Sequence, residues 1–483
     1  MAPAPRALLL LLALLLAGCA APSPPPAGPG PGPAAMPAWT AVCAISNWGD
    51  PCTAKGTQTQ GPANELMLAV NPTDPDNVVV GAKDYTPEGS GCVWAGTSVT
   101  HDGGRTWTNG FVGGDAANRD PQVAAYDCVT DPVLDYGSDG ALYYLVEAYG
   151  VLTDELAGIP PTPLGNGYGS NMWLAVSQDG GDTWTLRGAI SLGLGGSVLL
   201  HDKSDMAVSP TTGTIVAAWD AFNAASSQLI YVRSTDGGAT FGAPRTLMAT
   251  DRATNTGAMV DLDWDADGAL HAIFFDWNTG DVLYAKSADD GATFAQPVVV
   301  SPAHPWTGQN APNADFRIFD STMMAVDATD GARRGWLYAT WADDLLIADD
   351  HDVWFTRSED GGATWRTPMQ VGSWTGSDQF HPNVVVAADG SVHMVLYDRH
   401  YGDNNTLLDA TWVWSMDGGQ SWSSQRLSST SFDGDLGIHQ SGVPFMGDYI
   451  GIGAAGDVVY MTWADTREGR ADVAVAKVQR AAS

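Results

Sequence analysis

The chain repeats a pattern of short apolar runs separated by polar turns. A first run is mostly apolar, a turn with Asn, Asp or Gly follows, and a second run alternates between apolar and polar positions. The first runs cover residues 66–70, 206–208, 259–262, 323–326 and 384–387. The second runs end in polar or aromatic clusters at Lys83–Tyr85, Glu147, Trp219–Asp220, Asp276–Trp277, Trp341–Asp343 and Asp398–His400. Short runs with a period of two are typical of β-strands, so the pattern predicts an all-β fold.

A third strand-like run leads into one eight-residue motif, Ser/Thr-x-Asp-x-Gly-x-Thr/Ser-aromatic. This octet occurs six times, with its Asp at Asp102, Asp179, Asp236, Asp289, Asp360 and Asp417. We expect the carboxylate to accept backbone N–H bonds within a tight turn, and the Gly to supply the positive φ that the turn needs. The closing aromatic ring then buries a large apolar surface. We therefore assign these six Asp residues a structural role.

The spacing of the octets predicts a radial repeat. Successive motif Asp residues are 53 to 77 positions apart, which is room for one four-stranded sheet with its loops. This regularity predicts a β-propeller. After the sixth octet, strand-like runs return at residues 447–453, 458–463 and 473–476 with no further octet, so a strand from residues 39–45 is expected to complete the last sheet. We prefer seven blades; the alternative is six, with the last unit a partial repeat.

The first 38 residues predict export and lipid anchoring. Arg6 precedes an apolar run at residues 7–16 that is too short to span a bilayer, and Leu16-Ala17-Gly18-Cys19 matches a lipobox. We divide the chain into a signal peptide (1–18), a lipidated Cys19 with a Pro/Gly-rich tether (19–38) and the propeller (39–483). The expected location is the bacterial cell envelope, at the outer surface or in the periplasm. An ordinary secretory signal is the alternative.

The remaining cysteines are even in number, as expected for an exported protein. Cys43, Cys52, Cys92 and Cys128 allow two disulfides with three connectivities. Proximity in sequence favours Cys43–Cys52 with Cys92–Cys128. A zinc site is the rival, but the chain has neither a Cys-x-x-Cys pair nor clustered His.

The charge balance limits the range of partners. Only 22 Lys and Arg oppose 55 Asp and Glu, which gives a formal net charge of −33. A chain this acidic repels nucleic acid and anionic membrane surfaces, so we expect no nucleic-acid partner, and membrane contact only through the lipid anchor. We expect a monomer.

Charged residues gather where first strands begin and second strands end, which is one face of a propeller. First-strand starts contribute Asn64, Glu65, Asp120, Asp202, Asp205, Asp261, Arg317, Asp320, His381, Asp448 and Tyr449. Second-strand ends contribute Asp84, Glu147, Asp220, Asp276, Asp343, Asp398, Arg399, Asp465 and Arg467. Crowded carboxylates shift one another's pKa, as acid/base catalysis requires. The alternatives are strand-end capping and a structural Ca²⁺, which takes oxygen ligands; no cofactor is required. The tryptophans beside these ends (Trp219, Trp277, Trp341 and Trp463) either stack on sugar rings or form interblade core.

The octets resemble the Asp-box repeats, also called bacterial neuraminidase repeats, of the sialidase superfamily, over roughly residues 60–480. The resemblance implies a propeller and a glycan substrate or ligand. Enzymes of that family hold a sugar carboxylate with three arginines, and use a Tyr/Glu pair as nucleophile and an Asp as acid/base. The matching candidates here are Arg317, Arg399 and Arg467, with Asp398 and Asp465 beside two of them, then Tyr449 with Glu65, and Asp84 as acid/base. Arg119 is a fourth candidate arginine.

One departure from the family bears on activity. The Arg-Ile-Pro motif that the family carries before its first Asp box is absent, and the nearest string, Phe316–Phe319, lacks the Pro and falls in the fifth blade. The expected function is therefore an exported sialidase-like glycoside hydrolase acting on surface or extracellular glycans, an exo-glycosidase if active. The alternative is a non-catalytic propeller that binds a glycan or protein.

Overall fold

The computed structural model describes residues 39–41, 53–55, 61–85, 93–114, 118–124, 126, 128–149, 170–191, 200–222, 227–249, 259–276, 279–303, 307–319, 321–343, 350–372, 376–402, 405–440 and 443–481. These residues form β-strands and one short 3₁₀-helix, η2 (Gly434–Leu436), so the all-β prediction is confirmed. In the described part of the chain, no helix has the length and apolar character needed to cross a bilayer. The predicted signal peptide, Cys19 and the tether lie outside the described residues.

Within the described ranges, seven sheets share one plan, in which strands consecutive in sequence pair antiparallel from the inside outward. The first sheet is β3 (Ala63–Val70), β4 (Val78–Asp84), β5 (Trp94–Thr100) and β6 (Thr108–Phe111). The second is β7 (Cys128–Tyr136), β8 (Leu142–Tyr149), β9 (Asn171–Ser177) and β10 (Thr185–Ala189). The third is β11 (Leu200–Val208), β12 (Ile215–Phe222), β13 (Ser227–Ser234) and β14 (Arg245–Ala249). The fourth is β15 (Asp261–Trp264), β16 (Leu270–Asp276), β17 (Asp281–Ser287) and β18 (Val298–Pro302).

The remaining sheets of this plan follow along the chain. The fifth is β21 (Met323–Val326), β22 (Leu337–Asp343), β23 (Asp352–Ser358) and β24 (Met369–Gln370). The sixth is β25 (Gln379–Val386), β26 (Val392–Asp398), β27 (Asp409–Ser415) and β28 (Ser423–Arg426). The seventh is β31 (Gly451–Ala455), β32 (Val458–Asp465), β33 (Asp472–Arg480) and β1 (Trp39–Ala41), with β2 (Thr53–Lys55) also on β33.

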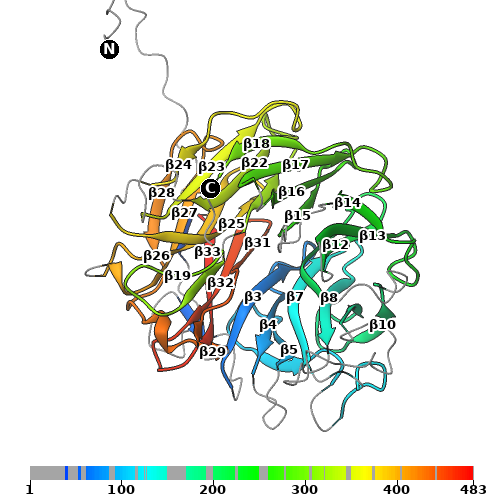
Figure 1. Cartoon of the computed structure of the whole chain (residues 1–483), viewed down its shortest axis with the longest axis horizontal. Coiled ribbons are helices and arrows are strands. Elements are labelled where there is room, and N and C mark those ends of the chain that lie inside the picture. Colours follow the sequence, from blue (N-terminus) through cyan, green and yellow to red (C-terminus); the bar gives the residue numbers. More distant parts are fainter. Residues whose placement is uncertain are drawn as a thin grey trace, which may run out of the picture.

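These seven sheets close into a ring, the arrangement of a β-propeller. Each first strand contacts the first strand of the next sheet, from β3 through β7, β11, β15, β21 and β25 to β31, and β31 contacts β3 again. Figure 1 shows the strands arranged around a common centre. The N-terminal strand β1 pairs antiparallel with β33, with Trp39 opposite Arg480, and so completes the last sheet as predicted. Among the described residues, the ring therefore contains seven sheets of this plan.

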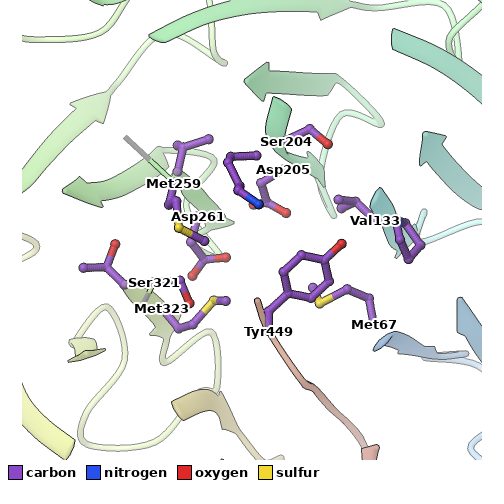
Figure 2. A pocket seen from close by; sticks show the side chains of 13 residues that line it. Met67, Val133, Ser204, Asp205, Met259, Asp261, Ser321, Met323 and Tyr449 are labelled. Carbon is purple, nitrogen blue, oxygen red and sulfur yellow. The ribbon is translucent and has the colours of Figure 1, made fainter. Parts of the chain in front are cut away.

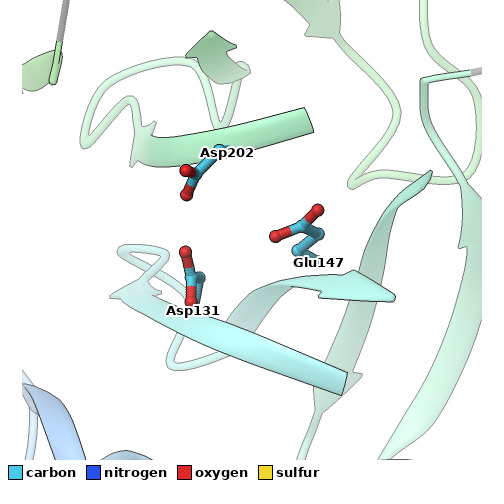
Figure 3. Close-up of side chains that lie close together, drawn as sticks. All are labelled: Asp131, Glu147 and Asp202. Atoms are coloured by element: carbon cyan, nitrogen blue, oxygen red, sulfur yellow. The ribbon is translucent and has the colours of Figure 1, made fainter. Parts of the chain in front are cut away.

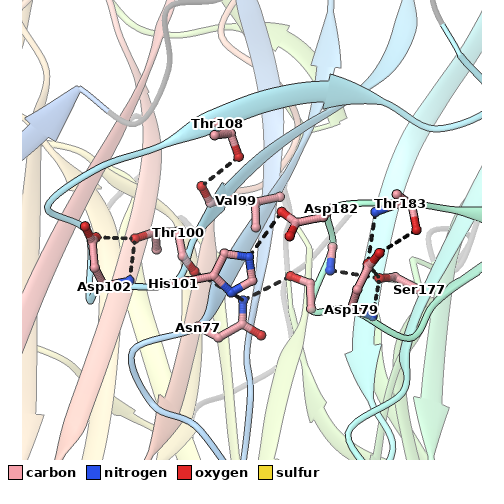
Figure 4. Close-up of polar contacts among 12 residues, drawn as sticks. Asn77, Val99, Thr100, His101, Asp102, Thr108, Ser177, Asp179, Asp182 and Thr183 are labelled. Carbon is pink, nitrogen blue, oxygen red and sulfur yellow. Dashed lines mark hydrogen bonds and ion pairs between the residues drawn. The ribbon is translucent and has the colours of Figure 1, made fainter.

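The octets form the turns between third and fourth strands. In the first, Asp102 accepts the Thr106 backbone N–H (2.9 Å) and the Thr100 and Thr106 hydroxyls (2.9 and 2.7 Å). The second repeats the scheme with Ser177, Asp179 and Thr183, as Figure 4 shows. The second Gly of the octet also fits closely against the neighbouring sheet. Gly362 has φ 92°, and a Cβ there would lie 2.2 Å from the Tyr284 hydroxyl. The motif therefore shapes a turn and leaves room for the adjacent sheet.

An eighth sheet departs from the prediction. It consists of β19 (Thr307–Asn310), β20 (Arg317–Phe319), β30 (Val443–Phe445) and β29 (Ile438–Gln440), and it joins two segments far apart in sequence. The string Phe316–Phe319 thus lies in this sheet and not in the fifth blade. β20 and β30 pair in parallel through Arg317 and Phe445, and Asn64 of the first sheet donates to the Phe445 carbonyl (3.1 Å). Sheet eight is thereby attached beside the start of β3.

The core lies between neighbouring sheets. Trp219, Trp341 and Trp463 are fully buried there, which supports the core interpretation of these rings over sugar stacking; Trp277 lies outside the described residues. The Trp341 and Trp463 indoles donate to Asp343 (3.3 Å) and Asp465 (3.2 Å) at the ends of their own strands. Cys128 is disulfide-bonded, while Cys43, Cys52 and Cys92 lie outside the described residues.

Candidate functional site

The site forms where several first strands bulge at the same level. The pairing register of first and second strands shifts after Asn64, Thr130, Asp202 and Phe380. Each shift places one residue in the left-handed region, namely Glu65 (φ 50°), Asp131 (φ 54°), Lys203 (φ 55°) and His381 (φ 48°). A bulge re-aims a side chain, and strained backbone of this kind concentrates at functional sites. Four sheets therefore direct ionisable side chains toward the same region.

Lys83, near the end of β4, bridges two of these bulge residues. Its ammonium lies 2.9 Å from Glu65 Oε2 and 3.6 Å from Asp131 Oδ1, and all three side chains are buried. One ammonium balances one negative charge in a medium of low dielectric constant. Lys83, Lys203 and the Thr130 hydroxyl hold the pKa of Asp131 below its usual value. Burial raises the pKa of Glu65 to about 8. At neutral pH Asp131 is therefore ionised while Glu65 keeps its proton.

Asp448 binds two further cations of the site. Its Oδ2 accepts from Lys203 (2.5 Å) and Arg317 (3.3 Å), and these cations lower its pKa against the effect of burial. Both cations also lie over aromatic rings of the eighth sheet, Lys203 over Phe319 (5.0 Å) and Arg317 over Phe445 (4.3 Å). The eighth sheet thus supplies one wall of the site and one of its cations.

Three carboxylates gather beside the Lys83 pair. One oxygen from each of Asp131, Glu147 and Asp202 lies within 4.8 Å of the others. Figure 3 shows the three side chains around one small space. Burial and the neighbouring charges raise the pKa of Asp202 to about 6 and that of Glu147 well above its usual value. The Ser170 hydroxyl holds Glu147 with a 2.7 Å hydrogen bond. Within this group, Asp131 is the carboxylate best stabilised as an anion.

Two tyrosine hydroxyls complete the polar surface. The Tyr85 and Tyr449 hydroxyls are buried and have no hydrogen-bond partner among the described residues. Burial raises the pKa of Tyr85 to about 12, and burial with the nearby Asp131 and Glu65 raises the pKa of Tyr449 well above its usual value. Both are therefore neutral donors at physiological pH.

A small cavity continues from this site into the centre of the ring. It has a volume of about 40 Å³ and is lined by first-strand residues of several sheets, including Met67, Asp205, Asp261 and Met323, with Tyr449 beside it. Figure 2 shows Asp261 and Ser321 on one side of this space and Met67 and Val133 on the other. A cavity of this size admits a small group or an ion but no sugar ring.

The structure brings together only some of the predicted site residues. Glu65 and Tyr449 lie near each other and near Asp448, which binds Arg317. Asp84 packs against the next strand instead, where a Cβ on Gly96 would lie 2.9 Å from Asp84 Cβ. Burial raises the pKa of Glu65, and Lys83, Asp131, Asp448 and Lys203 are the charged groups that also act on it.

The predicted arginine triad does not assemble. Arg399 is fully buried, and its two terminal guanidinium nitrogens are engaged by Asp378 (3.0 Å) and by the carbonyls of Pro312 and Thr406. Arg467 forms a two-pronged pair with Asp465 at the end of β32 (2.9 and 2.7 Å). Asp398 is occupied by His400 (2.6 Å) and Thr411. Arg119 lies over Trp94. Of the four arginines, Arg317 alone reaches the Asp448 group.

Sequence reasoning missed Lys83 as a bridge, and Asp131 and Lys203 as bulge residues. The signal that would have located these residues is the bulge in each first strand. Each bulge adds one residue, because two residues of the first strand lie opposite one residue of the second. The corresponding triplets are Asn64-Glu65-Leu66, Thr130-Asp131-Pro132 and Asp202-Lys203-Ser204. Aligning the first strands on these triplets would have placed the three side chains at one level.

Comparison with known proteins adds context for the fold. No protein-family model and no curated protein matches this chain. Many solved structures resemble it at low identity. An α-L-arabinanase from Penicillium chrysogenum complexed with arabinobiose is 14% identical, with 72% of this chain and 92% of that chain covered and a TM-score of 0.44. A Hadza microbial sialidase is 16% identical (83% and 73% covered, TM-score 0.44), and a polysaccharide lyase described as an ulvan lyase is 12% identical (90% and 97%, TM-score 0.47). At these values the similarities carry no argument about activity.

Proposed function

We propose that this protein is an exported glycoside hydrolase of sialidase-like fold that acts on extracellular glycans through the Glu65–Lys83–Asp131 group, near the starts of the first strands. Glu65 is the proton donor and Asp131 the ionised partner. The observation that supports this best is the single Lys83 ammonium in contact with both carboxylates. Two carboxyl groups whose environments drive their protonation states apart are the arrangement that glycosidic bond cleavage needs.

The proposed reaction proceeds in two steps. Glu65 donates its proton to the leaving glycosidic oxygen while the Asp131 carboxylate attacks the anomeric carbon and forms a glycosyl ester. The Glu65 carboxylate then removes a proton from water, which hydrolyses the ester. Because the two carboxyl oxygens lie 2.9 and 3.6 Å from one nitrogen, their separation is at most the sum of these distances. That bound is at the lower edge of the ~6.5–9.5 Å typical of inverting enzymes, so we expect retention of configuration.

The proposed substrate is a glycan, with no particular sugar assigned. A carboxylate-binding arginine triad would have favoured sialic acid, and Arg399 and Arg467 are engaged elsewhere. Arg317, Lys203 and the hydroxyls of Tyr85 and Tyr449 are the groups available to orient a sugar. The proposed lipid anchor would hold this site at the cell envelope.

The test is hydrolysis of a panel of fluorogenic glycosides, sialosides included, by the purified protein with and without EDTA. We expect at least one substrate to be cleaved, and cleavage to be lost in Glu65→Gln and Asp131→Asn. Asp182→Asn, which changes a half-exposed carboxylate at the second octet, is the matched control and should retain full activity. Silence across the panel, or full activity in Glu65→Gln, would reject the mechanism. Glycan-array binding by an inactive protein would then support the non-catalytic propeller.

A further inference from the structure

The small cavity at the centre of the ring adjoins the Glu65–Lys83–Asp131 group. Met67 lines it two residues after Glu65 along β3, and Val133 lines it two residues after Asp131 along β7. Two residues of a strand span about 7 Å, so the cavity begins close to both carboxyl groups. Tyr449 also lines it and acts on the same ionisable groups. A substituent of a sugar held at Glu65 and Asp131 is therefore within reach of this cavity.

The surface of the cavity consists largely of carbon. The apolar side chains that line it are those of Met67, Pro132, Val133, Met259, Val260 and Met323. Figure 2 shows Met259 and Met323 on one side of the space and Met67 and Val133 on the other. Methionine side chains adapt their shape to an apolar group placed among them. The lining thus suits a small hydrocarbon group.

The polar groups around the cavity are paired or covered. The Lys203 ammonium binds Asp448 (2.5 Å). Asp205 and Asp261 each accept a backbone N–H of the next sheet through Oδ2. Four lining hydroxyl oxygens are buried and inaccessible to water, those of Ser204, Ser321, Thr322 and Tyr449. A group that enters the cavity therefore meets mainly carbon atoms.

We propose that this cavity binds the methyl group of a 6-deoxy sugar, and that the glycan cleaved at Glu65 and Asp131 carries such a sugar at the cleaved bond. This inference rests on the proposed function and names its substrate class. The cavity of about 40 Å³ exceeds the ~10–15 Å³ that one water-sized group needs, so a methyl group fits while the sugar ring stays outside. Transfer of a methyl group from water to a carbon surface is favourable.

The same surface discriminates against other common sugars. The hydroxymethyl group of an ordinary hexose would bury its hydroxyl among carbon atoms, which is costly without a hydrogen-bond partner. A pentose has no group at this position and would leave the cavity unfilled. The 6-deoxy sugar is therefore the class that this lining favours.

The experiment is calorimetric titration of the full-length protein with L-fucose, L-rhamnose and D-fucose, each beside its parent hexose (L-galactose, L-mannose and D-galactose). We expect at least one 6-deoxy sugar to bind ~10–200-fold more tightly than its parent, the discrimination that one small group in an apolar pocket provides. The corresponding pentoses (D-arabinose, L-lyxose and L-arabinose) should also bind more weakly.

A cavity-filling variant locates the preference. Met67→Phe enlarges a half-buried side chain of the lining and should remove the preference for the 6-deoxy sugar. Val299→Phe, the matched change at an exposed position of β18, should keep it. Thermal unfolding of both variants shows that each is folded.

Binding and hydrolysis are measured separately, so the two proposals fail separately. A 6-deoxy preference without cleavage of any fluorogenic glycoside would support the methyl site and reject the hydrolysis. Three results would overturn the methyl site even if glycosides are cleaved. They are absence of binding by all three 6-deoxy sugars, equal binding of each 6-deoxy sugar and its parent, and an undiminished preference in folded Met67→Phe.

Discussion

At the scale of single residues, the site depends on a shortage of positive charge. Lys83 contacts two buried carboxyl groups, so one of them holds a proton at neutral pH. Because the pKa of Glu65 is about 8, its carboxyl group ionises just above physiological pH. A proton donor is most effective when its pKa lies near the working pH. The strained bulge at Glu65 is what brings this side chain to the shared ammonium.

Replacement of the proposed proton donor tests this arrangement directly. In Glu65→Gln we expect kcat on the best fluorogenic substrate to fall by ~10²–10⁴-fold, because a positioned acid contributes about that much. The wild-type rate should be level around neutral pH and decline as Glu65 ionises near pH 8. Initial rates from pH 5 to pH 10 measure both effects. A wild-type profile that keeps rising through pH 9 would contradict the assignment.

Two arginines that look equivalent in the sequence should behave differently. Arg399→Ala leaves the buried Asp378 carboxylate and two carbonyls without their donor, so we expect a loss of about 3–5 kcal/mol in the free energy of unfolding. Arg317 is about one third exposed and reaches the site. Arg317→Met should therefore retain stability within about 1 kcal/mol and raise KM about tenfold, the effect of losing one charged hydrogen bond.

Denaturant unfolding and steady-state kinetics separate the two cases. The same assays on Arg119→Ala provide a further control, because that guanidinium lies over Trp94 and donates to the Tyr126 carbonyl away from the site. Unchanged stability in Arg399→Ala would restore it as a candidate substrate ligand.

At the scale of elements, the sequence predicted the octet turns, which are formed by contiguous residues. It did not predict the bulges or the eighth sheet, which depend on how distant strands pair. An octet contains its own turn, since Asp417 and its partners Ser415 and Ser421 lie within seven positions. A bulge such as that at Lys203 exists only relative to a second strand, and the period-two pattern alone cannot locate it. The eighth sheet was missed for a similar reason, because β20 and β30 are paired over more than a hundred residues of chain.

The octet turns should contribute stability without contributing activity. Asp417 accepts the Ser415 and Ser421 hydroxyls and the N–H groups of Gln420 and Ser421. We expect Asp417→Ala to lower the free energy of unfolding by about 1–2 kcal/mol while kcat stays unchanged. These hydrogen bonds hold the pKa of Asp417 below its usual value, so its contribution is present above about pH 4 and is lost as the pH falls further. Denaturant unfolding at pH 7 and pH 3 measures this effect. The difference in the free energy of unfolding between Asp417→Ala and the wild type should be smaller at pH 3.

At the scale of the whole molecule, one short strand closes the ring. Trp39 of β1 is 5% exposed, packs edge-on against His393 (4.4 Å) and donates to Asp389 (3.1 Å) of the sixth sheet. This strand was predictable because a ring has to close, although its partners on the sixth sheet were not. We expect Trp39→Ala to lower the free energy of unfolding by about 3–5 kcal/mol, as for other buried tryptophans. A thermal unfolding temperature equal to that of the wild type would show that the ring does not depend on this closure.

The first strands are also tied to one another by buried carboxyl groups, which makes the stability of the ring depend on pH. Asp135 accepts the Val208 N–H (2.7 Å) and Asp263 accepts the Val326 N–H (2.8 Å), so each links its sheet to the next. Burial raises the pKa of both side chains to about 7. The folded state therefore retains protons that the unfolded chain releases near pH 4.

The sign of the effect follows from this difference in proton binding. Between about pH 4 and pH 7 the folded protein binds more protons than the unfolded chain, so stability decreases as the pH rises and levels off above pH 7. In EDTA-containing buffer we expect the free energy of unfolding to be larger at pH 5.5 than at pH 8. Asp263→Asn, which cannot ionise, should show a flatter dependence over this range, and Asp182→Asn on the surface should follow the wild type. If the free energy of unfolding instead increases from pH 5.5 to pH 8, the carboxyl groups of Asp135 and Asp263 are ionised in the folded ring. Positive charges near them would then have to compensate their burial.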